Sequence, residues 1–432
     1  MIRTIAATAV VYALVASGAE AGPTFSKDVA PILYNNCTNC HRTGEIGPMS
    51  LLTYADARPW ARSIATRVSN GTMPPWHADP AHGEYLNDRR LSASDKETIL
   101  QWVSDGAPEG DPKDLPPQPK YAEGWMIGQP DVVLAMQEDY PVPAAGTLEY
   151  KFFEVPTNFT EDKFIQGVEV RPGTRAVVHH VIVYMRSPRP QPRLTAFSFG
   201  PGMNKSPTPE QIKAKRDLND RPAPRALGGW LGGFAPGQGV RVYQPGTALR
   251  VPAGSVLIIS MHYTANGKET TDRTSVGLVF AKEPPRREVV VVPLQNENFT
   301  LKAGVADTRV DAEMTLQQDV TLWSALPHTH VRGKRWEIAT VSPDGEAKTI
   351  LGVPKYDFNW QTDYVFREPL RLAKGTKLRT SAWYDNSAAN KSNPDPTSDV
   401  TWGDQTWEEM QFTAFTFTVN DTQTTTSDKG KQ

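Results

Sequence analysis

From about residue 124 onward, the sequence is a succession of short segments in which apolar and polar residues alternate, broken by Gly and Pro. Alternation with a period of two places one set of side chains on each face of a β-strand. No helical pattern separates these segments, so the strands are expected to pair antiparallel, as they do in sandwiches. The clearest segments are residues 175–184, 255–263, 274–280, 289–292, 319–324 and 411–417.

This β region is too long for one sandwich, which usually holds fewer than its roughly 300 residues. The sequence Glu283-Pro284-Pro285 offers a break. Hydrophobic residues make up 39% of the chain, which is ample for packed cores, and its 37 prolines and 32 glycines favour turns and short strands. We therefore predict two antiparallel, jelly-roll-like β-sandwich domains, residues 124–283 and 284–422, and a mobile polar tail, residues 423–432.

In a chain of 432 residues, two to four domains are expected, and residues 22–112 are predicted to form a small all-α domain. Ser94 stands three residues before Glu97, an arrangement typical of a helix N-terminus. Residues 113–123 are rich in proline and have the composition of a linker. Helical patterns cover residues 24–36, 54–69 and 92–106.

The N-terminus has the pattern of a secretory signal peptide. Arg3 is positive, residues 5–15 form an uncharged apolar run, and Ala19-Glu20-Ala21 satisfies the small-x-small cleavage rule. The run is shorter than the roughly 20 residues that a membrane span needs, which argues against an uncleaved anchor, and no later segment is a candidate. We predict cleavage after Ala21 and export to the periplasm. The net charge of −2 gives no indication of a nucleic-acid partner.

The only two cysteines stand in the sequence Cys37-Thr-Asn-Cys40-His41. This C-x-x-C-H spacing attaches haem c, because two thiols bond to the vinyl groups and the next imidazole binds the iron. A redox-active or structural disulfide is the alternative, since exported proteins use disulfides freely. The helical context and a suitable second ligand downstream favour one covalently bound haem c, and therefore a cytochrome c domain.

Met73 is predicted to be the sixth ligand of the haem iron. A thioether raises the reduction potential, which suits electron transfer. Met73 lies far enough along the chain to reach the opposite haem face, and the two prolines that follow it stiffen its loop. Met49, close to the attachment motif, is the second candidate, and His77 and His82 remain as bis-histidine alternatives.

Five of the eight histidines lie in three tight groups within the β region, His179-His180, His262 and His328-Thr-His330. Any one alone could be an ordinary satisfied or solvent-facing histidine. Residues i and i+2 share a face of a strand, so His328 and His330 can bind one ion without distortion. His179 and His180 would point to opposite faces of a regular strand, so a shared ion requires a bulge or turn. Together the groups indicate a metal site, and imidazole suits copper.

Four motifs make a more specific resemblance possible. They are Val178-His-His-Val-Ile-Val-Tyr184, Met261-His-Tyr263, Pro327-His-Thr-His-Val-Arg-Gly333 and Glu408-Glu-Met410. In their order and separations, residues of about 124–420 resemble the copper type II, ascorbate-dependent monooxygenases, which include peptidylglycine α-hydroxylating monooxygenase and dopamine β-monooxygenase. The resemblance implies two sandwich domains with one copper ion each, facing each other across an open, solvent-filled cleft.

The resemblance also implies the ligands of two copper ions. One ion is held by histidines alone and stores an electron, whereas the other binds dioxygen and substrate with the help of a thioether, a soft ligand that favours Cu(I). From the residues alone, the thioether cannot be chosen among ten methionines, and Met314 is a rival. The implied ligands are His179, His180 and His262 for the first copper, and His328, His330 and Met410 for the second.

The implied reaction hydroxylates a C–H bond of a small organic substrate with dioxygen, one oxygen atom leaving as water. Peptide-amidating members of the family have an arginine two residues before the His-x-His pair, where this chain has Leu326. Two residues after the methionine they have an asparagine, where this chain has Phe412. Peptide amidation is therefore not expected. The vertebrate members also carry several disulfides, for which this chain has no cysteines beyond the haem pair.

The attached cytochrome suggests how electrons arrive. The family takes single electrons from ascorbate, and a haem tethered by a short linker could supply them at high effective concentration, after reduction by a periplasmic donor. Two other interpretations stay open: an electron-transfer or copper-holding protein without hydroxylase activity, and a cytochrome whose β region is structural. Arg332, Lys334 and Arg335 could bind an anionic substrate, but a solvated strand end is the expectation.

Overall fold

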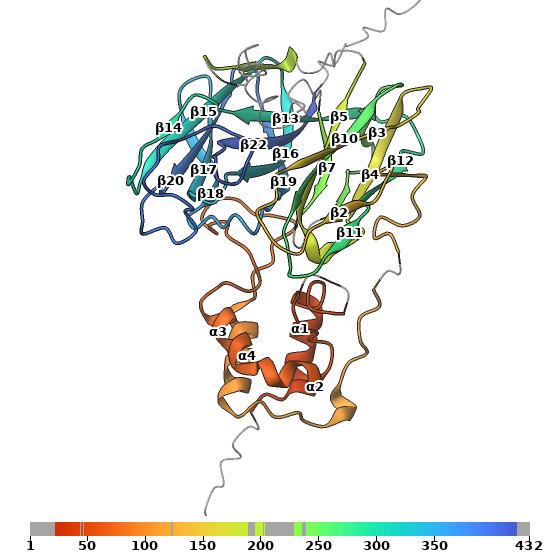
Figure 1. The fold of residues 1–432 in the computed structure, drawn as a ribbon, viewed down its shortest axis with the longest axis vertical. Helices are drawn as coiled ribbons and strands as arrows, with labels where there is room; N and C mark the ends of the chain where they lie inside the picture. The colour runs from red at the N-terminus through yellow and green to blue at the C-terminus, as the bar shows by residue number, and fades with distance from the viewer. Residues whose placement is uncertain are drawn as a thin grey trace, which may run out of the picture.

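The computed structural model describes residues 22–43, 45, 47–121, 124–188, 195–201, 203, 229–235 and 239–420. The expected signal peptide, residues 1–21, and the expected tail, residues 423–432, lie outside the described residues. The α-helices gather at one end of the molecule and the strands fill the rest, as Figure 1 shows. No helix in the described part is long and apolar enough to cross a membrane.

The helical unit, residues 22–114, has a core of its own around the fully buried Trp102. The three predicted helical segments are confirmed, but the cap of the last helix differs. Ser92, not Ser94, has the extended backbone of an N-cap, and its hydroxyl accepts the N–H of Asp95 at 3.0 Å. The elements are η1 (Phe25–Val29), α1 (Ala30–Asn36), α2 (Tyr54–Ala57), η2 (Arg58–Trp60), α3 (Ala61–Ser69), α4 (Ala93–Ser104) and η3 (Pro112–Asp114).

The remaining described residues form three larger sheets, and all six predicted strand segments lie in them. The nine-stranded central sheet has the order β1 (Val132–Ala135), β12 (Ser275–Phe280), β4 (Lys163–Arg171), β9 (Thr247–Val251), β13 (Arg287–Gln295), β22 (Phe412–Val419), β16 (Val320–His328) and β19 (Tyr364–Leu372), with β8 (Val240–Val242) paired to β4. The four-stranded sheet has the order β3 (Lys151–Pro156), β10 (Val256–Tyr263), β5 (Val178–Arg186) and β7 (Trp230–Phe234).

The five-stranded sheet covers the C-terminal half, and two small ribbons complete the β region. The order in the five-stranded sheet is β18 (Ala347–Val353), β17 (Gly333–Val341), β20 (Lys377–Tyr384), β15 (Thr308–Leu316) and β6 (Phe197–Phe199). The ribbons pair β2 (Tyr140–Val142) with β11 (Thr270–Asp272) and β14 (Thr300–Leu301) with β21 (Val400–Thr401).

The mostly β architecture is compatible with two sandwiches, but the two halves share their central sheet. The predicted break near residue 284 falls between β12 and β13, where β13 pairs with β9 in parallel rather than antiparallel. Alternate residues of β13 serve different cores: Val290 and Val292 belong to the C-terminal cluster, and Val289 and Val291 to the N-terminal cluster. The two cores are therefore joined through both faces of one strand.

The helical unit is attached to the C-terminal half by more than its linker. The side chains of Trp76 and Tyr85 are buried in the core of that half, where both rings pack edge-on against Tyr364. The N–H of Leu86 donates to the carbonyl of Val365 at 2.8 Å. The segment after α3 therefore lies against β19 as part of the sandwich.

A second contact joins the helical unit to the N-terminal half. Glu45, just after the cysteine motif, forms an ion pair with Arg175 in η4 (Arg175–Val177), the 3-10 turn that precedes β5. The predicted linker also packs back, since the Tyr121 ring lies 4.0 Å from the Arg42 guanidinium and its hydroxyl donates to Thr38. Together these contacts place the helical unit below both halves in Figure 1.

Candidate metal centres

The backbone irregularity expected at His179-His180 is present. In the pairing of β10 with β5, His262 lies opposite His180 but Tyr263 lies opposite Val178, so His179 is the extra residue of a β-bulge. The bulge lets two adjacent side chains turn the same way. The rings of His179, His180 and His262 have centroids 4.9–5.3 Å apart, and one nitrogen of each lies within 4.8 Å of the others.

This first group has nitrogen atoms that no other side chain uses. The Nε2 atom of His180 and the Nδ1 atom of His262 are buried and have no hydrogen-bond partner in the described part of the chain. Burial lowers the pKa of His180 well below its usual value, and the neighbouring histidines lower it further. Burial and His179 lower the pKa of His262 to about 3. The three rings are therefore neutral at physiological pH, as metal ligands must be.

The second group lies at the end of β16. In the pairing of β16 with β22, His328 lies opposite Phe412. Met410 precedes Phe412 by two residues, so the same antiparallel progression brings it to the level of His330. The rings of His328 and His330 have centroids 5.2 Å apart, and both side chains line one cavity with Met410. The structure thus brings the predicted second ligand set to one place.

Unlike the first group, both rings of the second group have an acceptor on Nδ1. The Nδ1 atom of His328 lies 2.9 Å from the side-chain oxygen of Gln361, and that of His330 lies 3.1 Å from the carbonyl of Glu408. These partners favour a proton on Nδ1 and leave Nε2 for a metal. Burial lowers the pKa of His328 to about 3 and that of His330 to about 4, so both are neutral.

A buried carboxylate lies between the predicted ligands of this second group. Glu409 is fully buried, and its oxygens accept the backbone N–H groups of His330, Arg332 and Met410 at 2.7–3.1 Å. Burial raises the pKa of Glu409 to about 7, although the three N–H donors act in the opposite direction. The side chain connects the loop after β16 to the segment before β22.

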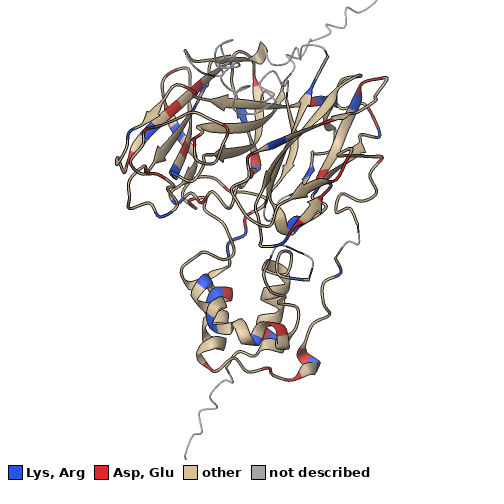
Figure 2. Ribbon diagram, viewed as in Figure 1, with Lys and Arg blue, Asp and Glu red and all other residues tan. Residues whose placement is uncertain are grey.

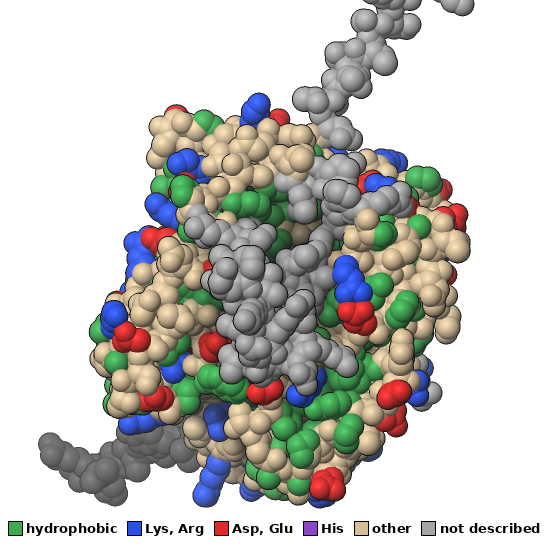
Figure 3. All heavy atoms as spheres, turned by 45° about the horizontal axis from the view of Figure 1, so that its top comes forward, with side chains coloured by type: hydrophobic (Ala, Val, Ile, Leu, Met, Phe, Trp, Pro, Cys, Tyr) green, Lys and Arg blue, Asp and Glu red, His purple; other side chains and the backbone are tan. Residues whose placement is uncertain are grey.

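Members of the two groups line the same large cavity, and the groups approach each other closely at one edge. The ring centroids of His180 and His328 are 6.4 Å apart, and the Nε2 atom of Gln361 lies 3.5 Å from Nδ1 of His180. Phe358 stacks on His179 at 5.1 Å and lies within 6.4 Å of the other four rings. On the face drawn in Figure 3, hydrophobic side chains and a few charged ones surround the central part of the surface.

The segment before Met410 also reaches the first group. The hydroxyl of Thr406 lies 3.4 Å from Nε2 of His262, and the side-chain oxygen of Gln405 accepts the N–H of Tyr150 at 3.3 Å. The Tyr150 ring stacks on His262 with centroids 4.7 Å apart. One loop of the C-terminal half therefore contacts both histidine groups, which explains how they are held together.

The predicted haem motif opens onto the same cavity as the histidines. The cavity has a volume of about 1600 Å³. His77 and His82 are not among its described lining residues; His77 lies near Asp357, and His82 lies against Gly352. The predicted ligands that line it are Cys37, Cys40, His41, Met49 and Met73 from the helical unit, with His179, His180, His328, His330 and Met410. Met73 as sixth haem ligand, with Met49, His77 and His82 as alternatives, stays a prediction.

The cysteine motif continues the turn in which α1 ends. The N–H groups of Cys40 and His41 donate to the carbonyl of Cys37 at 3.1 and 2.9 Å, so the motif is wound compactly. Both thiols are free, which excludes a disulfide in this structure. Burial raises the pKa of Cys37 to about 12, so this thiol is protonated and is not a reactive thiolate.

Comparison with known proteins identifies one part of the chain. Residues 285–410 match the C-terminal domain of copper type II ascorbate-dependent monooxygenases. The matched range contains the whole second group, and the family supports a copper-dependent monooxygenase, an oxidoreductase that uses dioxygen and a substrate. The donor set fits copper, because neutral imidazoles and a thioether are ligands that copper prefers and the first group has unpartnered buried nitrogens. No curated protein sequence matches the chain.

The solved structures found by comparison resemble this chain only weakly. The chain has 9% identity to the major capsid protein P2 of bacteriophage PM2, with a TM-score of 0.25 over 68% of this chain and 98% of that one. It has 7% identity to allantoicase of Saccharomyces cerevisiae, with a TM-score of 0.18 over 64% and 80%. Scores this low say nothing of fold or function here.

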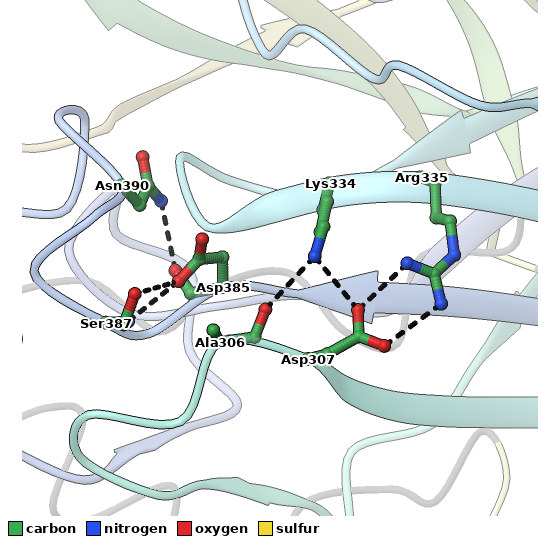
Figure 4. A network of polar contacts seen from close by, with 7 residues as sticks. All are labelled: Ala306, Asp307, Lys334, Arg335, Asp385, Ser387 and Asn390. Carbon is green, nitrogen blue, oxygen red and sulfur yellow. Dashed lines mark hydrogen bonds and ion pairs between the residues drawn. The ribbon is translucent and has the colours of Figure 1, made fainter.

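The expectation of a solvated strand end holds for two of three basic residues. Lys334 and Arg335 are partly exposed and pair with Asp307, as Figure 4 shows. For Arg332 it is wrong: the residue is 1% exposed, and its guanidinium donates to Asn386 and to the carbonyl of Trp407. Through these two hydrogen bonds, Arg332 joins the loop after β16 to the segments that contain Asn386 and Trp407.

Several residues at the site carry no sequence pattern that would have identified them. Gln361 and Phe358 lie in the irregular loop between β18 and β19. They contact the histidines only through the tertiary fold, which no local sequence pattern reveals. Glu409 stood inside the recognised Glu-Glu-Met motif, so its position was visible although its role was not. Met314, the rival thioether, is buried in the C-terminal core and does not line the cavity.

Proposed function

We propose that the protein is a periplasmic monooxygenase that hydroxylates a C–H bond of a small organic substrate at a pair of copper ions, with electrons supplied through a haem c on Cys37 and Cys40. The main support is the convergence of His179, His180, His328, His330 and Met410 on the cavity that also reaches the cysteine motif, with His262 grouped beside His179 and His180. The match of residues 285–410 to the monooxygenase family adds the chemistry.

In this proposal, the two histidine groups divide the work. His179, His180 and His262 would hold one copper, and His328, His330 and Met410 the other. Bound copper supplies the activation of dioxygen and the storage of a second electron. The chain's own task is to keep the imidazoles neutral and oriented. Burial keeps them neutral by lowering their pKa, and the hydrogen bond to Gln361 orients the His328 ring.

The walls beside the second group favour a substrate without a carboxylate. Leu326 and Phe412, which replace the polar residues of the peptide-amidating members, both line the cavity near His328. Of the cations that line the cavity, Arg241 is paired with Asp363 and Arg175 with Glu45. The apolar side chains beside His328 favour a substrate whose reacting part is uncharged, because an unpaired charge in an apolar site is costly.

The haem would be held by Cys37, Cys40, His41 and a methionine, and supplies single electrons when bound. Its proximity to the histidines would follow from the docked helical unit rather than from a free tether. The buried aromatic residues Trp76 and Tyr85 and the ion pair of Glu45 with Arg175 would keep that distance constant.

The proposal is tested by product analysis with isotopically labelled dioxygen, together with the rate at which reduced haem is reoxidised when substrate is added. We expect label in a hydroxylated product and a substrate-dependent reoxidation. Met410→Ala should abolish both, whereas Met314→Leu, which removes a thioether from the core with little change of volume, should keep both. Intact substrate-dependent reoxidation in Met410→Ala would contradict the proposal.

A second candidate is an electron-transfer or copper-holding protein without hydroxylase activity. The close approach of the two groups favours it, because the Gln361 side chain lies near both His180 and His328. This candidate predicts tight copper binding and haem reoxidation without label in any product. Labelled product excludes it.

A further inference from the structure

The second histidine group contains one buried ionisable side chain that is not a predicted ligand. Glu409 is fully buried, although a carboxylate loses much hydration on burial. It lies next to Met410 in the sequence, and its contacts are to backbone rather than to solvent. The hydrogen bonds of such a residue must offset the lost hydration, so its partners indicate what it does.

Its two oxygens hold two separate chain segments. Oε2 accepts the N–H of His330 at 2.8 Å and the N–H of Met410 at 3.1 Å, and Oε1 accepts the N–H of Arg332 at 2.7 Å. His330 follows β16 and Met410 precedes β22, so the carboxylate joins the loops that carry two predicted ligands. The carbonyl of the neighbouring Glu408 meanwhile orients the His330 ring.

We infer that Glu409 is a positioning residue for the His328–His330–Met410 site, because its carboxylate fixes the separation between the backbones of His330 and Met410. This inference rests on the proposed function, since it requires a metal at that site. Only a carboxylate satisfies the geometry, because all three donors are N–H groups and both oxygens must accept. A glutamine would present its own N–H₂ group to at least one of them.

The inference separates the two metal sites, which provides an internal control. Within the described part of the chain, the carboxylate of Glu409 accepts from the N–H groups of His330, Arg332 and Met410 and makes no hydrogen bond to His179, His180 or His262, so its replacement should affect one site and spare the other. A general loss of stability would instead affect both. Asp162→Asn is the control, because Asp162 is a partly buried carboxylate in the N-terminal half that accepts a backbone N–H, from Ala253, and also pairs with Arg250.

The experiment loads the full chain with Cu(I), measures copper per chain and affinity by competition with a chelator, and detects sulfur bound to copper by X-ray absorption. Wild type and Asp162→Asn should bind two copper ions, one with a sulfur neighbour. In Glu409→Gln, affinity at the sulfur-containing site should fall by roughly 10–100-fold and the sulfur signal should be lost, while the all-histidine site keeps its copper.

Unchanged affinity and sulfur signal in Glu409→Gln would overturn the inference, and so would an equal loss of copper at both sites. If Glu409→Gln does not fold, Glu409→Asp decides by the same criteria, because it keeps both acceptors but shortens the side chain by one methylene. Wild-type protein without sulfur-bound copper would contradict the proposed function itself, whereas a normal wild type with an unaltered variant contradicts only the role of Glu409.

Discussion

The two histidine groups are built from the same residue type but are held in different ways. In the N-terminal group, Nδ1 of His179 lies 3.0 Å from Nδ1 of His180, and buried nitrogens of His180 and His262 have no hydrogen-bond partner in the described part. In the C-terminal group, Gln361 and the carbonyl of Glu408 each hold one ring. The comparison teaches that the first site keeps buried nitrogens free for an ion, with aromatic rings packed on its histidines, whereas in the second site an acceptor on each Nδ1 orients the ring.

Removing a ligand should have the largest effect and should separate the groups. His180→Ala should abolish copper binding at the first site and leave the second loaded, while His330→Ala should do the reverse. Each loss should exceed the roughly 10–100-fold weakening typical of residues outside the coordination shell. Copper per chain after chelator competition measures this. Loss of both ions in either variant would mean that the groups form a single centre.

Acid should destabilise the metal-free protein through both groups together. The pKa is about 3 for His262 and His328 and about 4 for His330, against 6.5 in the unfolded chain. The unfolded state therefore binds more protons below pH 6.5, so the free energy of unfolding falls as pH decreases from 6.5 towards 4, by up to about 1.4 kcal/mol per unit and histidine. Chemical denaturation across this range tests it.

This pH dependence also sharpens the comparison. Replacement of His328 or His262 by glutamine should make the free energy of unfolding depend less steeply on pH. Each replacement removes one group that binds a proton in the unfolded state but not in the folded state. Copper-loaded protein should show a midpoint shifted to lower pH, since the ion competes with protons for the same nitrogens. A slope that is identical in wild type and both variants would contradict the neutral, buried state of these rings.

Gln361→Leu should weaken the second site selectively. The side chain accepts from His328 at 2.9 Å but lies 3.5 Å from His180, so the loss of orientation falls mainly on His328. We expect copper affinity there to fall by about tenfold, the lower end of such effects. Gln317→Leu, an exposed glutamine on a turn, is the control. Equal weakening of both sites would show that Gln361 serves them alike.

The smallest expected effect concerns the ion pair between the helical unit and the N-terminal half. Arg175 and Glu45 are 24% and 19% exposed, and pairs that solvent reaches contribute about 1 kcal/mol or less. Arg175→Gln should therefore lower the free energy of unfolding by no more than about 1 kcal/mol and leave copper binding at both sites unchanged. A large loss of copper at the first site would show that this contact shapes the bulge four residues later.

The local features of the fold could be predicted from the sequence because they depend on near neighbours. Periodicity located the helices and strands, and the adjacency of His179 and His180 required the bulge that is observed. The parallel pairing of β9 with β13 could not be predicted, because it joins segments far apart and has no local pattern. The burial of Trp76 in the C-terminal core could not be predicted for the same reason.

The site was predictable to the extent that its residues are chemically unusual. Grouped histidines indicated metal, and the Glu-Glu-Met motif directed attention to Met410. Gln361 and Phe358 are ordinary loop residues whose role arises only when the two sheets meet. The close approach of the two groups was not predicted, because it depends on Gln361, which lies near both His180 and His328 only when the two sheets meet.

We propose that the five histidines and Met410 form two separate metal centres of different composition. X-ray absorption on copper-loaded wild type and Met410→Leu tests it most directly. We predict two copper ions per chain in the wild type, with one sulfur neighbour that disappears in Met410→Leu while the nitrogen shell remains. A single copper ion per chain, or a sulfur signal that persists in Met410→Leu, would contradict this account.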